Sequence, residues 1–168
     1  VKTLYLIGGP MGVGKTAAGQ ALKQLLDRSV FLDGDWCWDM HPFRVTEETK
    51  ELVLGNIALL LNRFLRCSAC DHVILAWVLH RQEVLDALLE QVDTAGCAVR
   101  PISLVCRPEV LRARIGADIA AGRRDAGAAE RALAYLPLYR ELHTQHIDTS
   151  ELTPEQAARR ILERSQRT

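Results

Sequence analysis

Eight residues near the beginning of the chain form a phosphate-binding pattern. Residues 9–16 read Gly-Pro-Met-Gly-Val-Gly-Lys-Thr, which fits G-x-x-x-x-G-K-[ST]. Glycines let the chain turn so that several backbone N–H groups point at one anion, and the following helix adds the positive end of its dipole. In this pattern the lysine reaches the β- and γ-phosphates of a nucleotide, and the threonine hydroxyl binds Mg²⁺. The residues predicted to hold the nucleotide here are Gly9, Met11, Gly12, Val13, Gly14, Lys15, Thr16 and Ala17.

Two carboxylates, Asp33 and Asp35, follow the next short apolar run. Two positions apart in an extended stretch, they are expected to point the same way. Beside a phosphate loop, Asp33 would lie near Mg²⁺ together with Thr16, and Asp35 would accept the proton of a substrate hydroxyl. The alternative is an Asp-Gly turn with two solvated acids.

Aromatic and histidine side chains gather in the segments that follow the predicted strands. Large aromatics at a ligand-binding edge suit a planar or apolar substrate, although they could instead pack over the core. The two histidines are alternative proton acceptors, or structural groups. With Asp33 and Asp35, the predicted acceptor-binding residues are Trp36, Trp38, His41, Phe43, Trp77 and His80.

Arginines gather after the fourth apolar run. Arg123 and Arg124 lie between Gly122 and Gly127, and Arg131 follows. Positive groups neutralise the phosphoryl group during transfer, and flanking glycines are typical of a mobile closing lid. The alternative is a solvated helix end, where arginine is favourable in any case.

Cys67 and Cys70 form a C-x-x-C pair. A redox pair or half of a zinc site is one interpretation, but no second C-x-x-C or histidine pair completes it. The five cysteines are scattered and odd in number, which favours reduced thiols in an intracellular enzyme and a cytoplasmic location.

Alternating apolar and amphipathic segments predict the elements that carry these residues. Strands are expected at 2–7, 30–32, 72–78, 99–106 and 145–148. Helices are expected at 15–27, from a Thr46 N-cap to 66, and at 82–94, 108–121, 128–142 and from 154, where Thr153-Pro154-Glu155-Gln156 forms a capping box. Strands separated by helices indicate a parallel sheet, in which ligands bind beyond the carboxyl ends of the strands.

Composition narrows the function classes further. The 168 residues suit one soluble domain, with 48% hydrophobic and 25% charged residues. Lys+Arg and Asp+Glu both number 21, so no net basic charge indicates nucleic acid. The apolar stretches are too short to cross a membrane, and a start on a core strand predicts no signal peptide.

Several motifs, taken in order, resemble the small-molecule and nucleotide kinases of the P-loop class. They are the phosphate loop, the D-x-D at 33–35, an L-x-x-R-I helix at 111–115 leading to G-R-R, and D-T-S-x-x-T-P-E-Q at 148–156. This group includes adenylate, shikimate and gluconate kinases and chloramphenicol phosphotransferase. Residues 36–43 match none of its well-characterised members, so the chain looks like a separate branch of the group.

The resemblance implies a three-layer α/β P-loop NTPase fold with a five-stranded parallel sheet in the order 2-3-1-4-5 and helices on both faces. Residues 1–168 would form a single kinase domain with a short lid at about 122–131. By position, Arg114 matches the arginine on the adenine, and residues 150–154, with Thr153, match the loop beside it. Arg124 and Arg131 match lid arginines on the phosphates, with Arg123 a close competitor.

These residues predict an enzyme that uses ATP and Mg²⁺ to phosphorylate a small ring-bearing acceptor, such as a nucleoside, a nucleotide or an antibiotic. The predicted catalytic residues are Lys15, Asp35, Arg124 and Arg131. A regulatory or hydrolytic ATP-binding protein is one alternative, and a resistance protein that sequesters its drug is another. No nucleic acid or membrane partner is expected, and the sequence does not indicate an oligomeric state.

Overall fold

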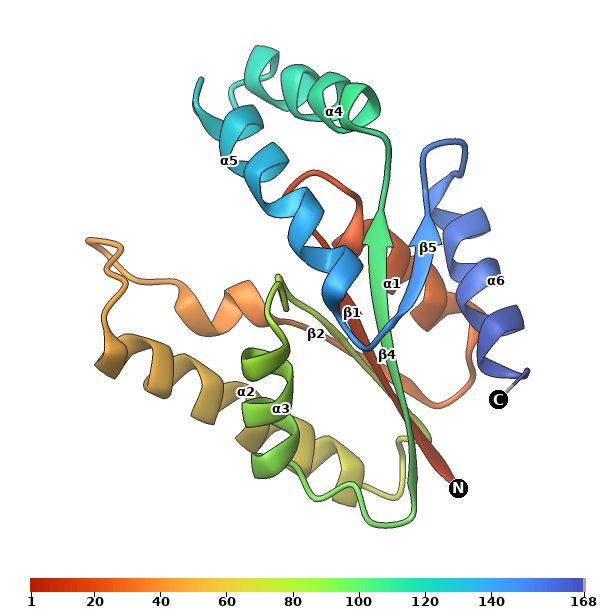
Figure 1. Ribbon diagram of the computed structural model, residues 1–168. Helices are drawn as coiled ribbons and strands as arrows, with labels where there is room; N and C mark the ends of the chain where they lie inside the picture. The colour runs from red at the N-terminus through yellow and green to blue at the C-terminus, as the bar shows by residue number, and fades with distance from the viewer. Residues whose placement is uncertain (168) are drawn as a thin grey trace.

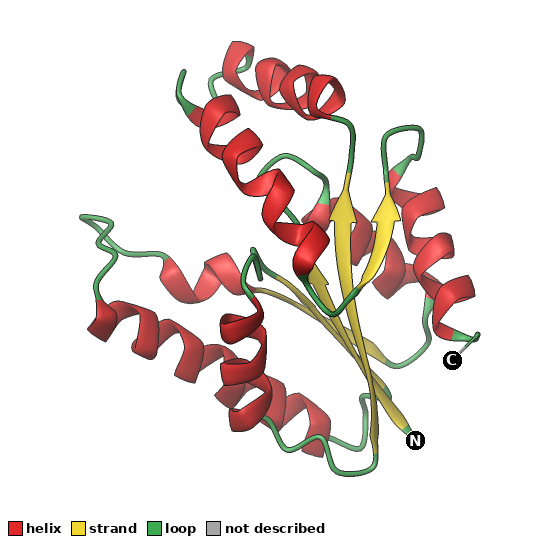
Figure 2. Cartoon of the chain, in the orientation of Figure 1, coloured by secondary structure: helices red, strands yellow, loops and turns green. Residues whose placement is uncertain are grey.

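A five-stranded parallel sheet forms the centre of the molecule (Figures 1 and 2). The structure is a computed structural model that describes residues 1–167. The order β2-β3-β1-β4-β5 confirms the expected topology. The strands are β1 (Lys2–Gly8), β2 (Ser29–Asp33), β3 (His72–Ala76), β4 (Cys97–Val105) and β5 (Gln145–Asp148).

Helices connect successive strands, as parallel pairing requires. They are α1 (Lys15–Leu25), α2 (Glu47–Arg66), α3 (Gln82–Gln91), α4 (Pro108–Ala120), α5 (Ala128–Tyr135) and α6 (Pro154–Ser165). Two short 3₁₀ segments, η1 (Gly34–Trp38) and η2 (Leu136–Glu141), follow β2 and α5. Pro137 thus lies in the 3₁₀ segment that ends the longer helix expected over 128–142.

The sheet is buried on both faces, which explains its almost continuous apolar strands. Along β1, Tyr5 and Ile7 pack in a core with α1 and α6, whereas Leu4 and Leu6 pack in a second core with α2 and α3. Burying one such aliphatic side chain stabilises the fold by roughly 1.5–3 kcal/mol. Figure 1 shows the resulting three layers.

The predicted Thr46 N-cap and the predicted capping box at α6 are both confirmed. At the start of α2, Thr46 Oγ1 accepts a hydrogen bond from the Thr49 backbone N–H, and Thr49 Oγ1 accepts one from the Thr46 backbone N–H, which makes this end a capping box as well. Thr153 and Gln156 make the same exchange at the start of α6. Each exchange satisfies two N–H groups that the first helical turn would otherwise leave unpaired.

Several predicted boundaries are wrong; helix α1, for example, ends at Leu25 rather than 27. Three of the differences are explained by contacts distant in sequence. Helix α3 ends at Gln91 rather than 94, because Asn62 of α2 donates to the Gln91 carbonyl and accepts from the Asp93 backbone, both at 2.8 Å. Strand β4 begins at Cys97 rather than 99, since Cys97 and the next residue still pair with β1. Gly96 therefore lies in the turn before β4.

The third boundary, the end of β3, lies beside the phosphate loop. Strand β3 ends at Ala76 rather than 78, and Leu79 turns the chain with a left-handed φ of 39°. The Val78 carbonyl accepts hydrogen bonds from the Gly9 backbone at 3.3 Å and from the Tyr139 hydroxyl at 2.6 Å. This one carbonyl therefore joins the loop after β3 to both the phosphate loop and η2.

The carboxyl ends of the strands meet at one edge of the sheet, and α4 and α5 lie over that edge (Figure 1). Leu111 and Ile115 of α4 pack in the same core as Val13 of the phosphate loop. Within the described residues, no helix has the length and apolar character needed to cross a membrane.

Candidate functional site

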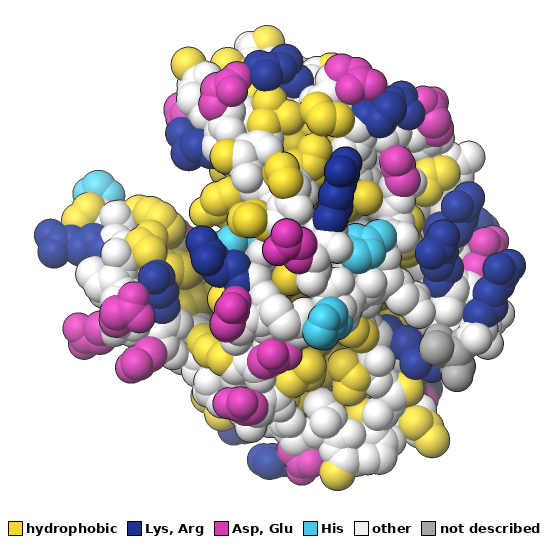
Figure 3. All heavy atoms as spheres, in the orientation of Figure 1, with side chains coloured by type: hydrophobic (Ala, Val, Ile, Leu, Met, Phe, Trp, Pro, Cys, Tyr) yellow, Lys and Arg dark blue, Asp and Glu magenta, His cyan; other side chains and the backbone are white. Residues whose placement is uncertain are grey.

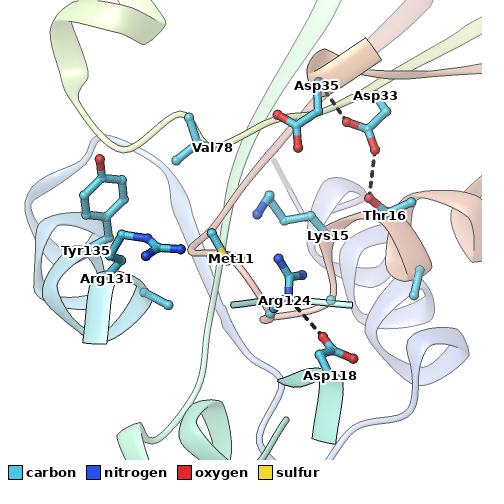
Figure 4. Close-up of a pocket in the computed structure, with 14 residues that line it drawn as sticks. Met11, Lys15, Thr16, Asp33, Asp35, Val78, Asp118, Arg124, Arg131 and Tyr135 are labelled. Atoms are coloured by element: carbon cyan, nitrogen blue, oxygen red, sulfur yellow. Dashed lines mark hydrogen bonds and ion pairs between the residues drawn. The ribbon is translucent and has the colours of Figure 1, made fainter. Parts of the chain in front are cut away.

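A cavity of about 480 Å³ lies at the carboxyl edge of the sheet. Figure 3 shows the surface hollowed on the side where α5 faces η1, and Figure 4 shows the side chains that point inward. Four segments distant in sequence contribute to its wall: the phosphate loop with α1, the η1 region, the loop after β3, and α4–α5. The lining residues are Met11, Gly12, Gly14, Lys15, Thr16, Ala17, Asp33, Asp35, Val78, Asp118, Arg124, Arg131, Ala132 and Tyr135.

The phosphate loop has the backbone that its sequence predicts. Gly12 and Gly14 adopt φ angles of 81° and 102°, which favour glycine. A Cβ at Gly12 would lie 2.5 Å from a methylene of Ile115, so this position also admits no larger side chain. Helix α1 begins at Lys15, directly after the turn. The loop and the helix N-terminus together form a cradle that fits a phosphate.

Lys15 is a partly buried cation without a carboxylate partner among the described residues. Its Nζ donates to the Pro10 carbonyl at 3.0 Å. Burial is the main cause that lowers the Lys15 pKa from 10.5 to about 8; Asp35 and Asp33 oppose this shift, and Arg124 adds to it. A polyphosphate would supply the negative charge that this amine lacks.

Thr16 and Asp33 meet at the start of α1. The Thr16 hydroxyl donates to Asp33 Oδ2 at 3.0 Å (Figure 4). A hydroxyl and a carboxylate are hard oxygen donors of the kind Mg²⁺ prefers, and one or two such ligands suffice because Mg²⁺ retains several waters. The pair therefore fits the metal that a nucleotide would bring.

The D-x-D spacing predicts that both aspartates lie in one extended stretch, and this prediction is wrong. Asp33 ends β2 and caps η1, where its Oδ1 accepts a hydrogen bond from the Asp35 backbone at 2.9 Å. The chain turns here because this cap satisfies the second N–H of the 3₁₀ segment, that of Asp35. Both carboxylates still line the cavity.

Asp35 lies between negative and positive neighbours. Burial is the main cause that raises its pKa, and the nearby charge of Asp33 raises it further, while Lys15 and Arg124 oppose this shift. A carboxylate with a raised pKa is a better proton acceptor than a solvated one. Its position in the wall of the cavity, across from Arg131 and Tyr135, suits a role toward a second substrate (Figure 4).

The predicted arginine segment is an ordered turn at the end of α4. The Gly122 backbone donates to Ile119 and the Arg123 backbone to Asp118, with Gly122 at a left-handed φ of 73°. These bonds make a Schellman motif, so the chain reverses directly after the helix. The turn brings Arg124 into the cavity wall.

Each of the arginines expected in the lid is held by a carboxylate. Arg124 donates through Nε to Asp118 Oδ2 at 3.0 Å, and Arg131 donates through both terminal nitrogens to Asp125 at 3.1 and 2.7 Å. Arg123 binds Asp118 Oδ1, and its side chain is 67% exposed. Arg124 and Arg131 line the cavity, whereas Arg123 does not.

Sequence reasoning missed Asp118 and Tyr135. Tyr135 lies one helical turn after Arg131 on α5, so the two share a face that points into the cavity. Its ring stacks on His80 with centroids 4.8 Å apart and an angle of 8°. The i, i+4 spacing to Arg131 was the available signal, and the apolar Val78 extends the same wall.

The predicted aromatic and histidine residues do not line the cavity. Trp77 is 7% exposed and packs against Gly34, where a Cβ would lie 2.3 Å from the indole, so it belongs to the core. His80 stacks on Tyr135 and is not among the lining residues. The others lie along the chain after β2, where Trp36 packs edge-on against Phe31, Trp38 packs against Phe43, and His41 is exposed.

A second cavity of about 200 Å³ adjoins the first at Gly14. Arg114 lies in its wall, where its guanidinium donates to the Val13 carbonyl at 3.2 Å and to the Thr149 carbonyl at 2.7 Å. Thr153, predicted to contact a nucleotide, does not line this cavity, because its side chain caps α6. The lining residues are Val13, Gly14, Ala18, Arg114, Thr149, Leu152, Pro154 and Ala157.

Cys67 and Cys70 lie away from both cavities. They follow α2 at the opposite edge of the sheet, where Lys2 at the start of β1 donates to the Cys67 carbonyl. Both are free thiols. Burial is the main cause that raises the Cys70 pKa, with Cys67 adding to it, which makes this thiol less reactive.

A family model described as an AAA domain matches residues 6–132. A search of curated proteins finds no match.

Solved structures of kinases and of a resistance protein share the fold. A gluconokinase from Sinorhizobium meliloti 1021 superposes with a TM-score of 0.73 at 18% identity, covering 98% of this chain and 92% of that one. The Deinococcus radiodurans tunicamycin resistance protein gives 0.68 at 20% identity, covering 98% and 95%. Shikimate kinase from Acinetobacter baumannii gives 0.64 at 22% identity, covering 97% and 92%. The chain therefore belongs to the AAA domain family and has the fold of the P-loop small-molecule kinases.

Proposed function

We propose that this protein transfers the γ-phosphoryl group of ATP, with Mg²⁺, to a hydroxyl group of a small ring-bearing molecule such as a nucleoside, a nucleotide or an antibiotic. The observation that carries the proposal is one cavity lined by a phosphate cradle and a lysine, an oxygen pair suited to Mg²⁺, a second carboxylate and two arginines. This set provides the groups that phosphoryl transfer requires. The fold shared with several kinases supports it.

The donor side is formed by the phosphate loop. Its backbone N–H groups and Lys15 would hold the phosphates, and Thr16 with Asp33 would hold the metal. Bound Mg²⁺ supplies charge neutralisation for the leaving diphosphate. The smaller cavity beside Gly14 would take the adenine, with Arg114 in its wall, since Gly14 borders both spaces.

The acceptor side is formed by Asp35, Val78 and Tyr135. The oxygen of the acceptor hydroxyl would form a bond to the γ-phosphorus while Asp35 takes the hydroxyl proton. The bond from this phosphorus to the bridging oxygen would break, and ADP would leave. Tyr135, stacked on His80, offers aromatic surface to a ring. Arg124 and Arg131, within a lid of about residues 122–131, would neutralise the group in transfer.

A screen of acceptors tests this proposal. Nucleosides, nucleotides and antibiotics are incubated with ATP and Mg²⁺, and both ADP release and the mass of the acceptor are followed. ADP that appears only with an acceptor, together with the mass of one added phosphoryl group, is the expected result. ADP release that no acceptor changes would indicate a hydrolytic or regulatory protein, and tight drug binding without turnover would indicate sequestration. The Lys15→Ala variant is the negative control.

The five cysteines of the chain are all free thiols. Unpaired thiols persist in reducing compartments. We therefore propose the cytoplasm as the location of the reaction.

A further inference from the structure

The two arginines of the cavity wall are held in different ways. Asp118 binds Arg124 through the Nε atom, and no described residue accepts a hydrogen bond from the two terminal nitrogens of Arg124. Asp125 binds Arg131 through both terminal nitrogens. Arg124 is therefore oriented with its phosphate-binding edge free, whereas Arg131 has that edge occupied.

The free edge of Arg124 faces the centre of the site. Figure 4 shows the guanidinium extending from Asp118 toward Lys15. Its charge acts on both Lys15 and Asp35, which lie on the donor and acceptor sides of the cavity. The place between those two residues is where the terminal phosphoryl group of a nucleotide would lie.

Asp118 has the support that an orienting residue needs. It lies in the last turn of α4, its backbone carbonyl accepts from the Arg123 backbone at 2.8 Å, and its side chain is 25% exposed. Its other carboxylate oxygen is occupied by Arg123 at 2.9 Å. The carboxylate is thus fixed by bonds on both oxygens, so it can hold Arg124 in one orientation.

We infer that Asp118 is a positioning residue: it presents the terminal nitrogens of Arg124 to the γ-phosphate before a nucleotide arrives. The inference rests on the proposed function. It also assigns Asp125 the opposite effect, because phosphate must compete with Asp125 for the terminal nitrogens of Arg131. Pre-orientation removes an ordering cost that would otherwise be met on binding.

Two matched variants separate positioning from simple charge. Asp118→Asn and Asp125→Asn each remove one negative charge beside the proposed polyphosphate, so electrostatics alone makes both bind nucleotide more tightly. Positioning instead predicts that the two variants differ from each other in their affinity for a nucleotide with a γ-phosphate. Calorimetry with the Mg²⁺ complexes of AMP-PNP and ADP needs no acceptor and isolates the γ-phosphate.

Asp118→Asn is expected to weaken AMP-PNP binding about tenfold while leaving ADP binding within about twofold of wild type. Asp125→Asn is expected to bind AMP-PNP as tightly as wild type or more tightly. In an Arg124→Ala background, Asp118→Asn is expected to cause no further loss. Arg124→Lys, which leaves α4 intact, is expected to show the same selective loss should Asp118→Asn fail to fold.

The inference is overturned if Asp118→Asn binds AMP-PNP as tightly as wild type, loses both nucleotides equally, or still weakens binding without Arg124. Arg124→Lys with wild-type affinity for AMP-PNP overturns it as well. Wild-type protein that binds neither nucleotide overturns the proposed function, and the inference falls with it. If the wild-type protein binds both nucleotides but a variant gives one of the contrary results above, the inference about Asp118 is overturned and the proposed function stands.

Discussion

The Thr16 hydroxyl donates a 3.0 Å hydrogen bond to the Asp33 carboxylate, which joins the first turn of α1 to the end of β2. These residues are 17 positions apart, and only the parallel sheet brings their elements to the same edge. The bond places two oxygen donors side by side next to the phosphate cradle. The proposed role of this pair in holding Mg²⁺ can be tested apart from chemistry on an acceptor.

The Asp33→Asn variant is expected to raise about tenfold the Mg²⁺ concentration that half-saturates Mg²⁺-dependent nucleotide binding, since an amide replaces the charged donor. ADP binding without Mg²⁺ is expected to change little. Calorimetric titrations of ADP at a series of Mg²⁺ concentrations measure both. Thr16→Ser keeps the hydroxyl and is the matched control. An unchanged Mg²⁺ requirement in Asp33→Asn would assign the metal to other ligands.

The Lys15→Met variant is expected to stabilise the ligand-free protein by about 1–3 kcal/mol at pH 7 while abolishing transfer. The folded state holds the Lys15 pKa near 8, below the unfolded value of 10.5, so burying the charged amine costs stability below pH 8. That cost falls as pH rises from about 8 to 10.5, because the folded protein then loses the proton first. Urea unfolding at pH 7 and pH 10 measures the difference between variant and wild type, which should shrink at pH 10. A variant less stable than wild type at pH 7 would contradict this account.

Nucleotide binding is expected to be coupled to proton uptake at Lys15. A polyphosphate favours the charged amine, so its pKa should rise from about 8 on binding. Near pH 8.5 the free protein is partly deprotonated at this site, and ADP affinity should fall as pH rises further. Calorimetry in buffers of different ionisation enthalpy gives the number of protons taken up. The Lys15→Met variant should show none, and equal uptake in both proteins would place the proton elsewhere.

The Asp35→Asn variant is expected to lower kcat by about 10² or more, while nucleotide affinity stays near that of wild type. The acceptor found in the screen is the substrate for this measurement. Because the Asp35 pKa is raised, wild-type turnover should fall as pH drops through a value above 3.8, where the carboxylate gains a proton. A kcat that survives the substitution would assign the proton to solvent.

The parts of the site that the sequence predicts are those built from neighbouring residues. The phosphate loop is one continuous segment whose glycines, lysine and threonine each have a local reason, and the Thr46 N-cap and the capping box of α6 are equally local. The order of strands came from family resemblance, because apolar runs alone do not say which strands pair. The sheet then brought Asp33 to Thr16 as expected, although through a capped 3₁₀ turn.

The parts that escaped prediction depend on contacts between distant elements. An aromatic residue after a strand can face the ligand or the core, and for Trp77 the close approach of Gly34 decided for the core. Asp118 reads as an ordinary acid in a helix until the turn at Gly122 brings two arginines back to it. The end of α3 was set by Asn62, 29 residues before Gln91. None of these pairings leaves a periodic signal in the chain.

At Val78, the backbone carbonyl stabilises the loop, and the side chain, a different set of atoms, faces the cavity where a substrate would bind. The carbonyl joins the loop after β3 to Gly9 and Tyr139, while the side chain forms part of the cavity wall. A main-chain oxygen is present whichever amino acid is encoded, so exchanging the valine leaves both hydrogen bonds possible. Residue 78 is thus a natural place for evolution, or for a designer, to retune which molecule is accepted without dismantling the scaffold.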